Sequence, residues 1–309
     1  MKMAKAPIKK HTSKQVKGRE RTYRVSAINI VLHPHSPEKY AELWREIFSS
    51  DDPVKVRGTS AVMIGSCSAV NDGNDKEGVT GVVYKFFKLD AAEPWFDTQK
   101  RTAADKGELS KISIPDHLKP HLQEFSYVFY PKGHRLYFVS SRSGAQLSPK
   151  FLLSYLERVV ERAEFSRFGE IKLTVVPSEE SISQILSLSR LKSLYLDIHK
   201  PNPDDQKSAE ALMQARLKKQ NIKRSEITLT EASSSGIKPD DETKILIKIA
   251  ANNGEVRARG QNSNGEVVTL STEKHPLQEV VSYDSNIQSE RSSLQNFAAS
   301  LHARFFGGR

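Results

Sequence analysis

The sequence is poor in cysteine and in long apolar runs. Cys67 is the only cysteine among 309 residues, so no disulfide can form within the chain. That usage is typical of a reducing compartment. No run of about 18 apolar residues occurs, which argues against a membrane-spanning helix. The basic start of the chain has no apolar stretch behind it, unlike a secretory signal. These absences predict a cytoplasmic protein with no membrane association.

The motifs of several enzyme classes are also missing. The chain contains neither the Gly-x-Ser-x-Gly of serine hydrolases nor the Gly-x-x-x-x-Gly-Lys of phosphate-binding loops. His33, His35, His117 and His121 fall in predicted loops, and no Cys-x-x-Cys accompanies them as a zinc site would require. The sequence therefore predicts no catalytic residue, no metal site and no cofactor.

Positive charge is concentrated at one end of the chain. The formal net charge is +10, and residues 1–24 hold nine Lys or Arg against Glu20 alone, a local charge of 9 − 1 = +8. A basic, polar segment of this kind predicts a disordered tail over residues 1–21 that contacts nucleic-acid phosphates, or else one that only increases solubility. The candidate phosphate contacts in it are Lys9, Lys10, Lys14, Lys17, Arg19 and Arg21.

The rest of the chain predicts an α+β fold in three parts. Residues 22–165 read as an antiparallel sheet with helices packed against it, since strands dominate and Ser36-Pro37 is a typical helix start. Residues 166–283 alternate strands and helices, which predicts a C-terminal α/β sandwich domain. Residues 284–309 are expected to contain a terminal helix, which is a possible dimerisation element.

Two surfaces of the folded part are candidates for phosphate contact. The first is the turn between strands 125–130 and 135–140, where Lys132 and Arg135 are expected to face solvent with Tyr130 nearby for stacking. The second is the strand from Glu255 to Gly260, whose alternation places Arg257 and Arg259 on one face. Neighbouring cations extend this second candidate into a basic stripe (Arg216, Lys218, Lys219, Lys223, Arg224, Lys244 and Lys248).

Acidic motifs leave a nuclease as an alternative. Glu170-Ile171-Lys172 on a predicted strand resembles half of a magnesium-dependent site, but its nearest Pro-Asp partner, Asp116, is more than 50 residues upstream. The acidic runs at 203–205 and 239–242 stand where helices begin, where carboxylates complement the helix dipole.

The terminal helix carries an apolar seam. Its members are spaced by 7, 3, 4 and 4 residues and lie on one helical face: Ile287, Leu294, Phe297, Leu301 and Phe305. Packing against the protein's own body and a two-fold dimer seam are both consistent with this pattern.

The chain resembles a family of bacterial proteins known only as a domain of unknown function. The similarity covers almost everything beyond the tail and implies no chemistry. The stretches that carry it are Ile28–His35, Thr80–Tyr84, Pro94–Phe96, Ile114-Pro115, the Tyr127–Phe138 hairpin, Lys200–Asp205 and Ala258–Gly260.

A second similarity is one of layout. The order of residues 185–201, a helix, residues 224–232 and the hairpin at 254–271 is similar to that in the phage Rex exclusion protein A and in the DNA-binding subunit of the Kiwa defence system. Both are DNA-associated, dimer-forming phage-defence proteins, and the similarity assigns no residue role. It implies a DNA-binding homodimer in anti-phage defence. The alternatives are a nuclease with a diverged site and a protein-interaction scaffold.

Overall fold

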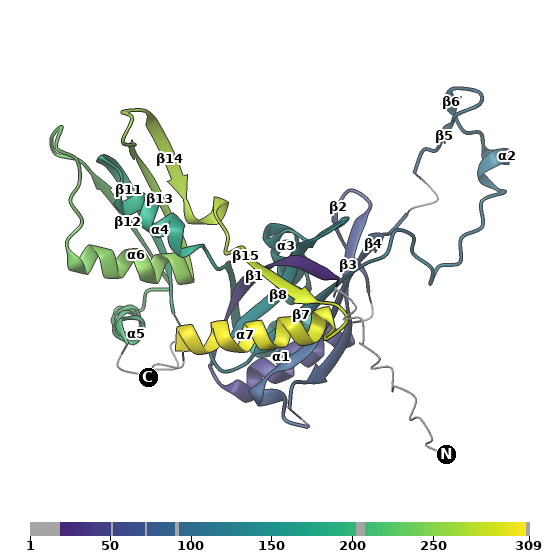
Figure 1. The fold of residues 1–309 in the computed structure, drawn as a ribbon, viewed down its shortest axis with the longest axis horizontal. Coiled ribbons are helices and arrows are strands. Elements are labelled where there is room, and N and C mark those ends of the chain that lie inside the picture. Colours follow the sequence, from purple (N-terminus) through teal and green to yellow (C-terminus); the bar gives the residue numbers. More distant parts are fainter. Residues whose placement is uncertain (1–18, 51, 72, 90–92, 202–207, 307–309) are drawn as a thin grey trace, which may run out of the picture.

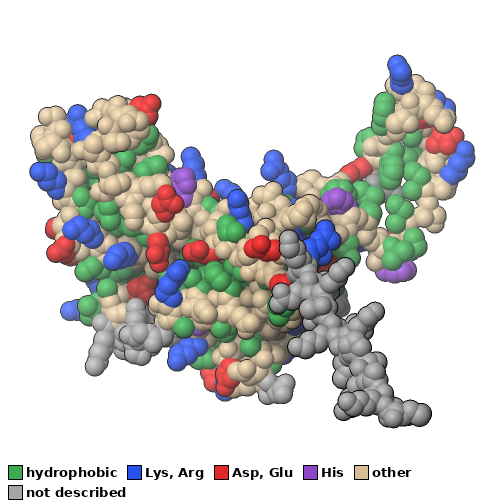
Figure 2. All heavy atoms as spheres, in the orientation of Figure 1, with side chains coloured by type: hydrophobic (Ala, Val, Ile, Leu, Met, Phe, Trp, Pro, Cys, Tyr) green, Lys and Arg blue, Asp and Glu red, His purple; other side chains and the backbone are tan. Residues whose placement is uncertain are grey.

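The structure, a computed structural model, describes residues 19–50, 52–71, 73–89, 93–201, 208–306 of the chain. It is an α+β fold built on two antiparallel sheets. A slender arm lies at the end of the larger sheet remote from the smaller one (Figure 1). Figure 2 shows that the smaller-sheet lobe and the arm rise on the same side of the body.

The larger sheet is organised around one long strand, β1 (Glu20–His33). One edge of β1 pairs with β8 (Arg135–Arg142), and its other edge pairs end to end with β15 (Glu279–Asp284) and β10 (Glu170–Val175). Beyond β8 the order is β7 (Gln123–Tyr130), β4 (Val79–Phe87), β3 (Ser60–Ala69) and β2 (Val54–Arg57), and the short β9 (Ala145–Gln146) also pairs with β8. All of these pairs are antiparallel.

The division predicted at residue 165 does not coincide with the division between the sheets. Strands β10 and β15 lie within residues 166–283, yet both extend the larger sheet through β1. The sequence order of strands and helices indicates which elements exist, but it does not indicate which sheet a strand joins.

Helices cover both faces of the larger sheet. Helix α1 (Pro37–Ser49) follows the predicted cap, with the Ser36 side chain accepting a hydrogen bond from the Lys39 amide. Trp44 of α1 donates to the Tyr127 hydroxyl at 3.0 Å on one face. Helix α3 (Pro149–Val160) contacts both β2 and β10, the two ends of the strand path, so the sheet is curled.

Helix α7 (Glu290–Phe306) covers the other face of the larger sheet. Leu294 and Leu301 are buried in the protein's own core, and Phe297 and Phe305 pack against it. Ile287 precedes the helix and is 82% exposed. Of the two interpretations of the seam, the structure shows packing against the protein's own body, so this seam is not a free dimer surface.

The smaller sheet has helices on one face. Its strand order is β12 (Arg224–Thr230), β11 (Arg190–His199), β13 (Gly254–Gln261) and β14 (Val267–Ser271), all antiparallel. Its apolar side chains form a second core with α4 (Glu179–Leu186), α5 (Ala209–Lys219) and α6 (Asp241–Asn253). The described part of the chain also contains the short 3-10 helices η1 (Asp75–Glu77), η2 (Ala163–Phe168) and η3 (Thr272–Lys274).

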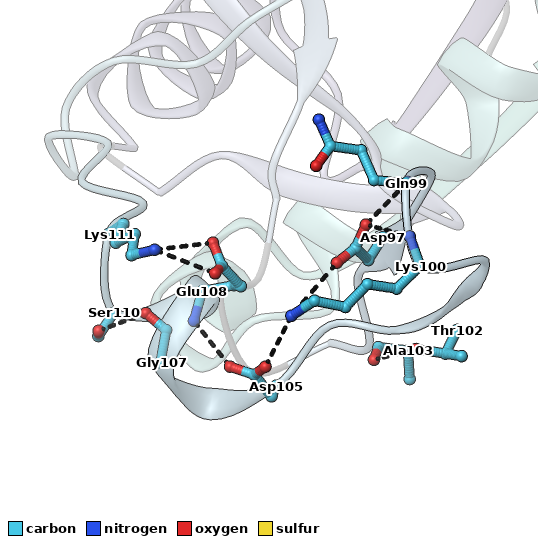
Figure 3. Close-up of polar contacts among 10 residues, drawn as sticks. All are labelled: Asp97, Gln99, Lys100, Thr102, Ala103, Asp105, Gly107, Glu108, Ser110 and Lys111. Carbon is cyan, nitrogen blue, oxygen red and sulfur yellow. Dashed lines mark hydrogen bonds and ion pairs between the residues drawn. The ribbon is translucent and has the colours of Figure 1, made fainter.

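The arm, residues 93–122, connects β4 to β7 and carries β5 (Phe96–Asp97), β6 (Thr102–Ala103) and α2 (Lys106–Leu109). Figure 3 shows that ionic contacts link its own segments: the Lys100 ammonium lies 3.8 Å from Asp97 and 3.2 Å from Asp105. Most of its residues are exposed, including five large apolar ones: Phe96, Ile112, Ile114, Leu118 and Leu122.

Candidate nucleic-acid interface

The outer face of the smaller sheet presents the two predicted arginines. Along β13 burial alternates: Val256 and Ala258 are buried in the second core, whereas Arg257 and Arg259 are exposed. Successive side chains of a strand point to opposite faces. The prediction that both arginines point away from the core is therefore confirmed.

Tyr195 of β11 lies beside Arg257 on this face. The two residues are directly paired across the strands, and the guanidinium carbon of Arg257 is 4.4 Å from the ring centroid of Tyr195. Ser193 pairs in the same way with Arg259. The result is a cation–aromatic platform within a polar surface, an arrangement that suits phosphate contact and base stacking.

At one end of the face, acidic side chains form ion pairs with a neighbouring arginine. Arg224 donates to both carboxylate oxygens of Asp197, at 2.7 and 2.9 Å. Although burial of Asp197 acts in the opposite direction, these hydrogen bonds and the nearby positive charges lower the pKa of its carboxyl. Glu226 also pairs with Arg224, at 2.8 Å. Anion binding on this face is therefore expected at the opposite end, near Arg259.

The two arginines differ in their partners. Arg257 forms an ion pair with Glu255, with Nε 3.1 Å from the carboxylate, in addition to its contact with Tyr195. Among the described residues Arg259 has neither an ion pair nor a side-chain hydrogen bond. Its guanidinium is the group most open to an incoming phosphate.

The broader basic stripe is not continuous. Lys244 and Lys248 lie on α6, which packs against the inner face of the sheet, so they are on the opposite side of this lobe from Arg257 and Arg259. Arg216 and Lys219 lie on α5, which also packs on the inner side. These cations are close together in the sequence, which suggested one surface. The sequence could not show that the sheet and its helices separate them onto opposite sides of the lobe.

The tail candidates are divided between two regions. Lys9, Lys10, Lys14 and Lys17 lie outside the described residues. Strand β1 begins at Glu20, inside the segment 1–21 that was predicted to be a disordered tail, so Arg21 belongs to the larger sheet, where it pairs with Tyr283. Arg19 and Arg21 are both exposed.

The hairpin turn after β7 contradicts its predicted exposure. Lys132 is exposed, but His134 and Arg135 are only 7% and 8% exposed. The end of α7 covers this turn so closely that a Cβ on Gly133 would lie 2.5 Å from the His302 ring. The residues of the turn could not indicate that α7, about 170 residues downstream in the sequence, packs over it. Arg135 is therefore not a surface phosphate contact.

The acidic motifs within the described residues do not assemble the alternative site, and the run at 203–205 lies outside those residues. Asp240 caps α6, accepting a hydrogen bond from the Thr243 amide at 2.8 Å, as the structural interpretation predicted. Glu170 is paired with Lys223 at 3.0 Å. Within the described ranges no cluster of three or more His, Cys, Asp or Glu side chains is arranged to hold a metal ion.

Sequence reasoning missed the contributions of Tyr195 and Asp197 to this face. The alternation along 190–199 contained the signal, since Leu194, Leu196 and Ile198 are the buried set and Tyr195 falls between them. Identifying the neighbour of Arg257 also required the register between β11 and β13, which neither strand specifies alone.

The fold and this face define a class: α+β proteins in which a curled, covered sheet carries a smaller sheet with an open, arginine-bearing surface. The chain belongs to the family described as Domain of unknown function (DUF4747), whose model matches residues 21–299. No curated protein matches the sequence. In the described part of the chain, no helix is both long and apolar enough to cross a membrane.

Proposed function

We propose that this protein binds nucleic acid, DNA in the first instance, through backbone phosphates at the open face of the smaller sheet. The observation that carries the proposal is the pair of exposed arginines on β13, one beside Tyr195 and the other without an ion pair among the described residues. Planar guanidinium groups suit bidentate contact with phosphate oxygens.

The charge distribution supports a second, sequence-independent contribution. Residues 1–24 carry eight of the ten net positive charges. Additional cations in the same chain raise affinity by neutralising further phosphates, and they make affinity steeply dependent on salt.

The similarity in layout to the phage Rex exclusion protein A and to the DNA-binding subunit of the Kiwa system supports DNA over RNA and suggests a role in bacterial anti-phage defence. It also supports a cytoplasmic homodimer. Because the α7 seam is already buried, the proposed dimer uses another surface.

The central test removes both arginines. In protein lacking residues 2–18, which leaves β1 intact, the double variant Arg257→Ala, Arg259→Ala should bind a short DNA duplex about ten- to thirtyfold more weakly. Fluorescence anisotropy at fixed salt measures the affinity, and circular dichroism checks the fold. Affinity within about twofold of the parent would overturn the proposed face.

A matched control separates this face from bulk charge. Arg216→Ala, Lys219→Ala removes the same two positive charges from exposed positions on α5, on the other side of the lobe. It should change affinity much less than the β13 variant. Equal losses in the two variants would indicate diffuse electrostatic attraction rather than a defined face.

The tail has its own test. Deleting residues 2–18 should weaken binding to unrelated duplexes to a similar extent and flatten the dependence of log affinity on log salt. Unchanged affinity would assign the tail to solubility alone.

A further inference from the structure

A cavity of about 870 Å³ lies between the two sheets, on the helix-covered side of the smaller one. The turn after β7 and the end of α7 contribute to its wall from the larger-sheet side. Helices α4, α5 and α6 contribute from the smaller-sheet side. Its volume falls within the range of small-molecule sites, roughly 300–1,000 Å³. It is separate from the open face that bears Arg257 and Arg259.

Arg135 lines this cavity and has an incomplete set of partners. Its side chain is 8% exposed, and its Nη1 atom is buried with no hydrogen-bond partner among the described residues. Its Nη2 donates to the Asn252 side chain at 3.4 Å, and its guanidinium lies 5.8 Å from the centroid of the Phe306 ring. Burial lowers its pKa, but a guanidinium remains charged at neutral pH because its ordinary pKa lies far above neutrality.

A buried polar network holds Arg135 in place. The buried Asn29 donates to the Asn252 carbonyl at 3.0 Å, and its side-chain oxygen lies 2.7 Å from Nδ1 of His134. Asn252 belongs to α6, so the network fixes the end of that helix to β1 and to the start of β8. The guanidinium is therefore presented by a rigid junction.

The charged residues that line the cavity have a net positive charge, which favours an anionic ligand. A buried cation is costly unless an anion compensates it. Glu210, a carboxylate of the described lining, accepts a hydrogen bond from Asn253 at 3.1 Å; its charge acts on Arg135 from a distance, without an ion pair. Counted over the described lining, three cations (Lys132, Arg135 and Lys248) face two carboxylates (Glu179 and Glu210).

The N-terminus of α5 adds a second favourable field. Ser208, Ala209 and Glu210, at the start of this 11-residue helix, line the same cavity. A helix N-terminus attracts anions through its free amides and its dipole. The remaining wall is largely apolar and suits a ring (Ile182, Leu186, Ile245, Ile249, Phe305 and Phe306).

We propose that this cavity binds a phosphate monoester of about the size of a mononucleotide. Its phosphate is bound by Arg135 and the start of α5, and its ring packs against the apolar wall at the end of α7. Lys132 and Lys248, both exposed, attract the anion at the rim of the cavity. The phosphate supplies a negative charge that no described residue places beside Nη1 of Arg135.

The experiment uses the full chain with 5′-AMP and 5′-GMP, titrated by calorimetry and by thermal shift. At least one of the two should bind and raise the melting temperature, whereas adenosine and guanosine, which lack the phosphate, should not. Equal binding of nucleoside and nucleotide, or binding of glutarate in place of both nucleotides, would overturn the phosphate assignment. No binding of any of these compounds would overturn the proposal.

Arg135→Met is the decisive variant. It should weaken nucleotide binding at least about tenfold, because hydrogen bonds to a charged group are lost. In the absence of ligand it should fold with an unchanged or higher melting temperature, since replacing an uncompensated buried charge by an apolar side chain relieves its desolvation cost. Unchanged nucleotide affinity would refute the site.

Two further variants keep the test informative if Arg135→Met fails to fold. Lys248→Glu reverses a charge on the cavity rim and should weaken nucleotide binding severalfold. Lys244→Glu makes the same change one turn earlier on α6, outside the lining, and should leave nucleotide binding unchanged. Equal effects of these two would refute the site. Arg257→Ala, Arg259→Ala should also retain nucleotide binding, which distinguishes this inference from the proposed nucleic-acid face.

Discussion

The two sheets of this protein are stabilised in different ways. The larger sheet is covered on both faces, by α1 and α3 on one side and by α7 on the other, and most of its large aromatic side chains are almost entirely inaccessible. The smaller sheet buries one face against α4, α5 and α6 and leaves the other to solvent, with charged and polar residues in register. The comparison indicates that the larger sheet mainly provides stability, and that the smaller one has a face available for binding.

The largest effect should come from charging the helix that closes the larger sheet. Leu294→Asp together with Leu301→Asp places two carboxylates at positions 0% and 4% exposed, at a cost of several kcal/mol. The cooperative unfolding transition should be lost in circular dichroism. Ile287→Asp, at a position 82% exposed, is the control and should fold normally. A folded monomer from the double variant would show that α7 is dispensable for the core.

A smaller effect should remain confined to the smaller sheet. Leu194→Ala truncates a fully buried side chain of the second core and should cost about 2–5 kcal/mol. Hydrogen exchange should accelerate over residues 190–270, because the two cores consist of separate groups of side chains. Thr228→Ala, on the exposed side of β12, should change stability by less than about 0.5 kcal/mol. Equally accelerated exchange in β7 and β8 would show that the sheets unfold as one unit.

The acidic end of the open face makes a pH-dependent contribution. The folded-state pKa of Asp197 is lowered, so the carboxylate stabilises the fold above its ordinary pKa of 3.8, and this contribution is lost as pH falls through the lowered value. Arg224→Met should therefore lower the urea midpoint at pH 7, with a smaller deficit at pH 3. Lys223→Met, whose partner Glu170 is partly exposed, should show little change at either pH. A deficit for Arg224→Met that is constant with pH would assign it to lost packing.

The smallest effect should come from the platform on the open face. Tyr195→Leu removes the ring beside Arg257 and should cost about 0.5–1 kcal/mol, the usual range of an exposed cation–π contact. Urea denaturation monitored by circular dichroism measures it. A much larger loss would mean that this face also contributes to the core, which would weaken the contrast between the sheets.

Much of the local structure could be predicted from the sequence. Ser36 and Pro37 begin α1 as expected, and the alternation along β13 correctly separates Arg257 and Arg259 from Val256 and Ala258. These features depend on neighbours within a few residues. The sequence pattern therefore contains most of the information that determines them.

The failures all involve contacts between distant segments. The burial of Arg135 depends on Phe306 and on Asn252, which lie more than 100 residues away in the sequence. The membership of β10 and β15 in the larger sheet depends on the length of β1, which is long enough to pair with both on one edge. A local pattern contains neither piece of information.

The arm is an insertion whose length and sequence can vary among members of the family. It leaves the larger sheet after β4 and returns at β7, where Lys85 and Gln123 are paired and the Phe87 amide donates to the Pro120 carbonyl at 2.9 Å. Its two ends therefore meet on adjacent strands, and the sheet beneath it would close equally well with a short hairpin turn. Its internal ionic contacts involve no residue of the core (Figure 3). Evolution can lengthen, shorten or replace such an insertion at little cost to the fold, so relatives can diverge here in what they recognise while retaining the same body.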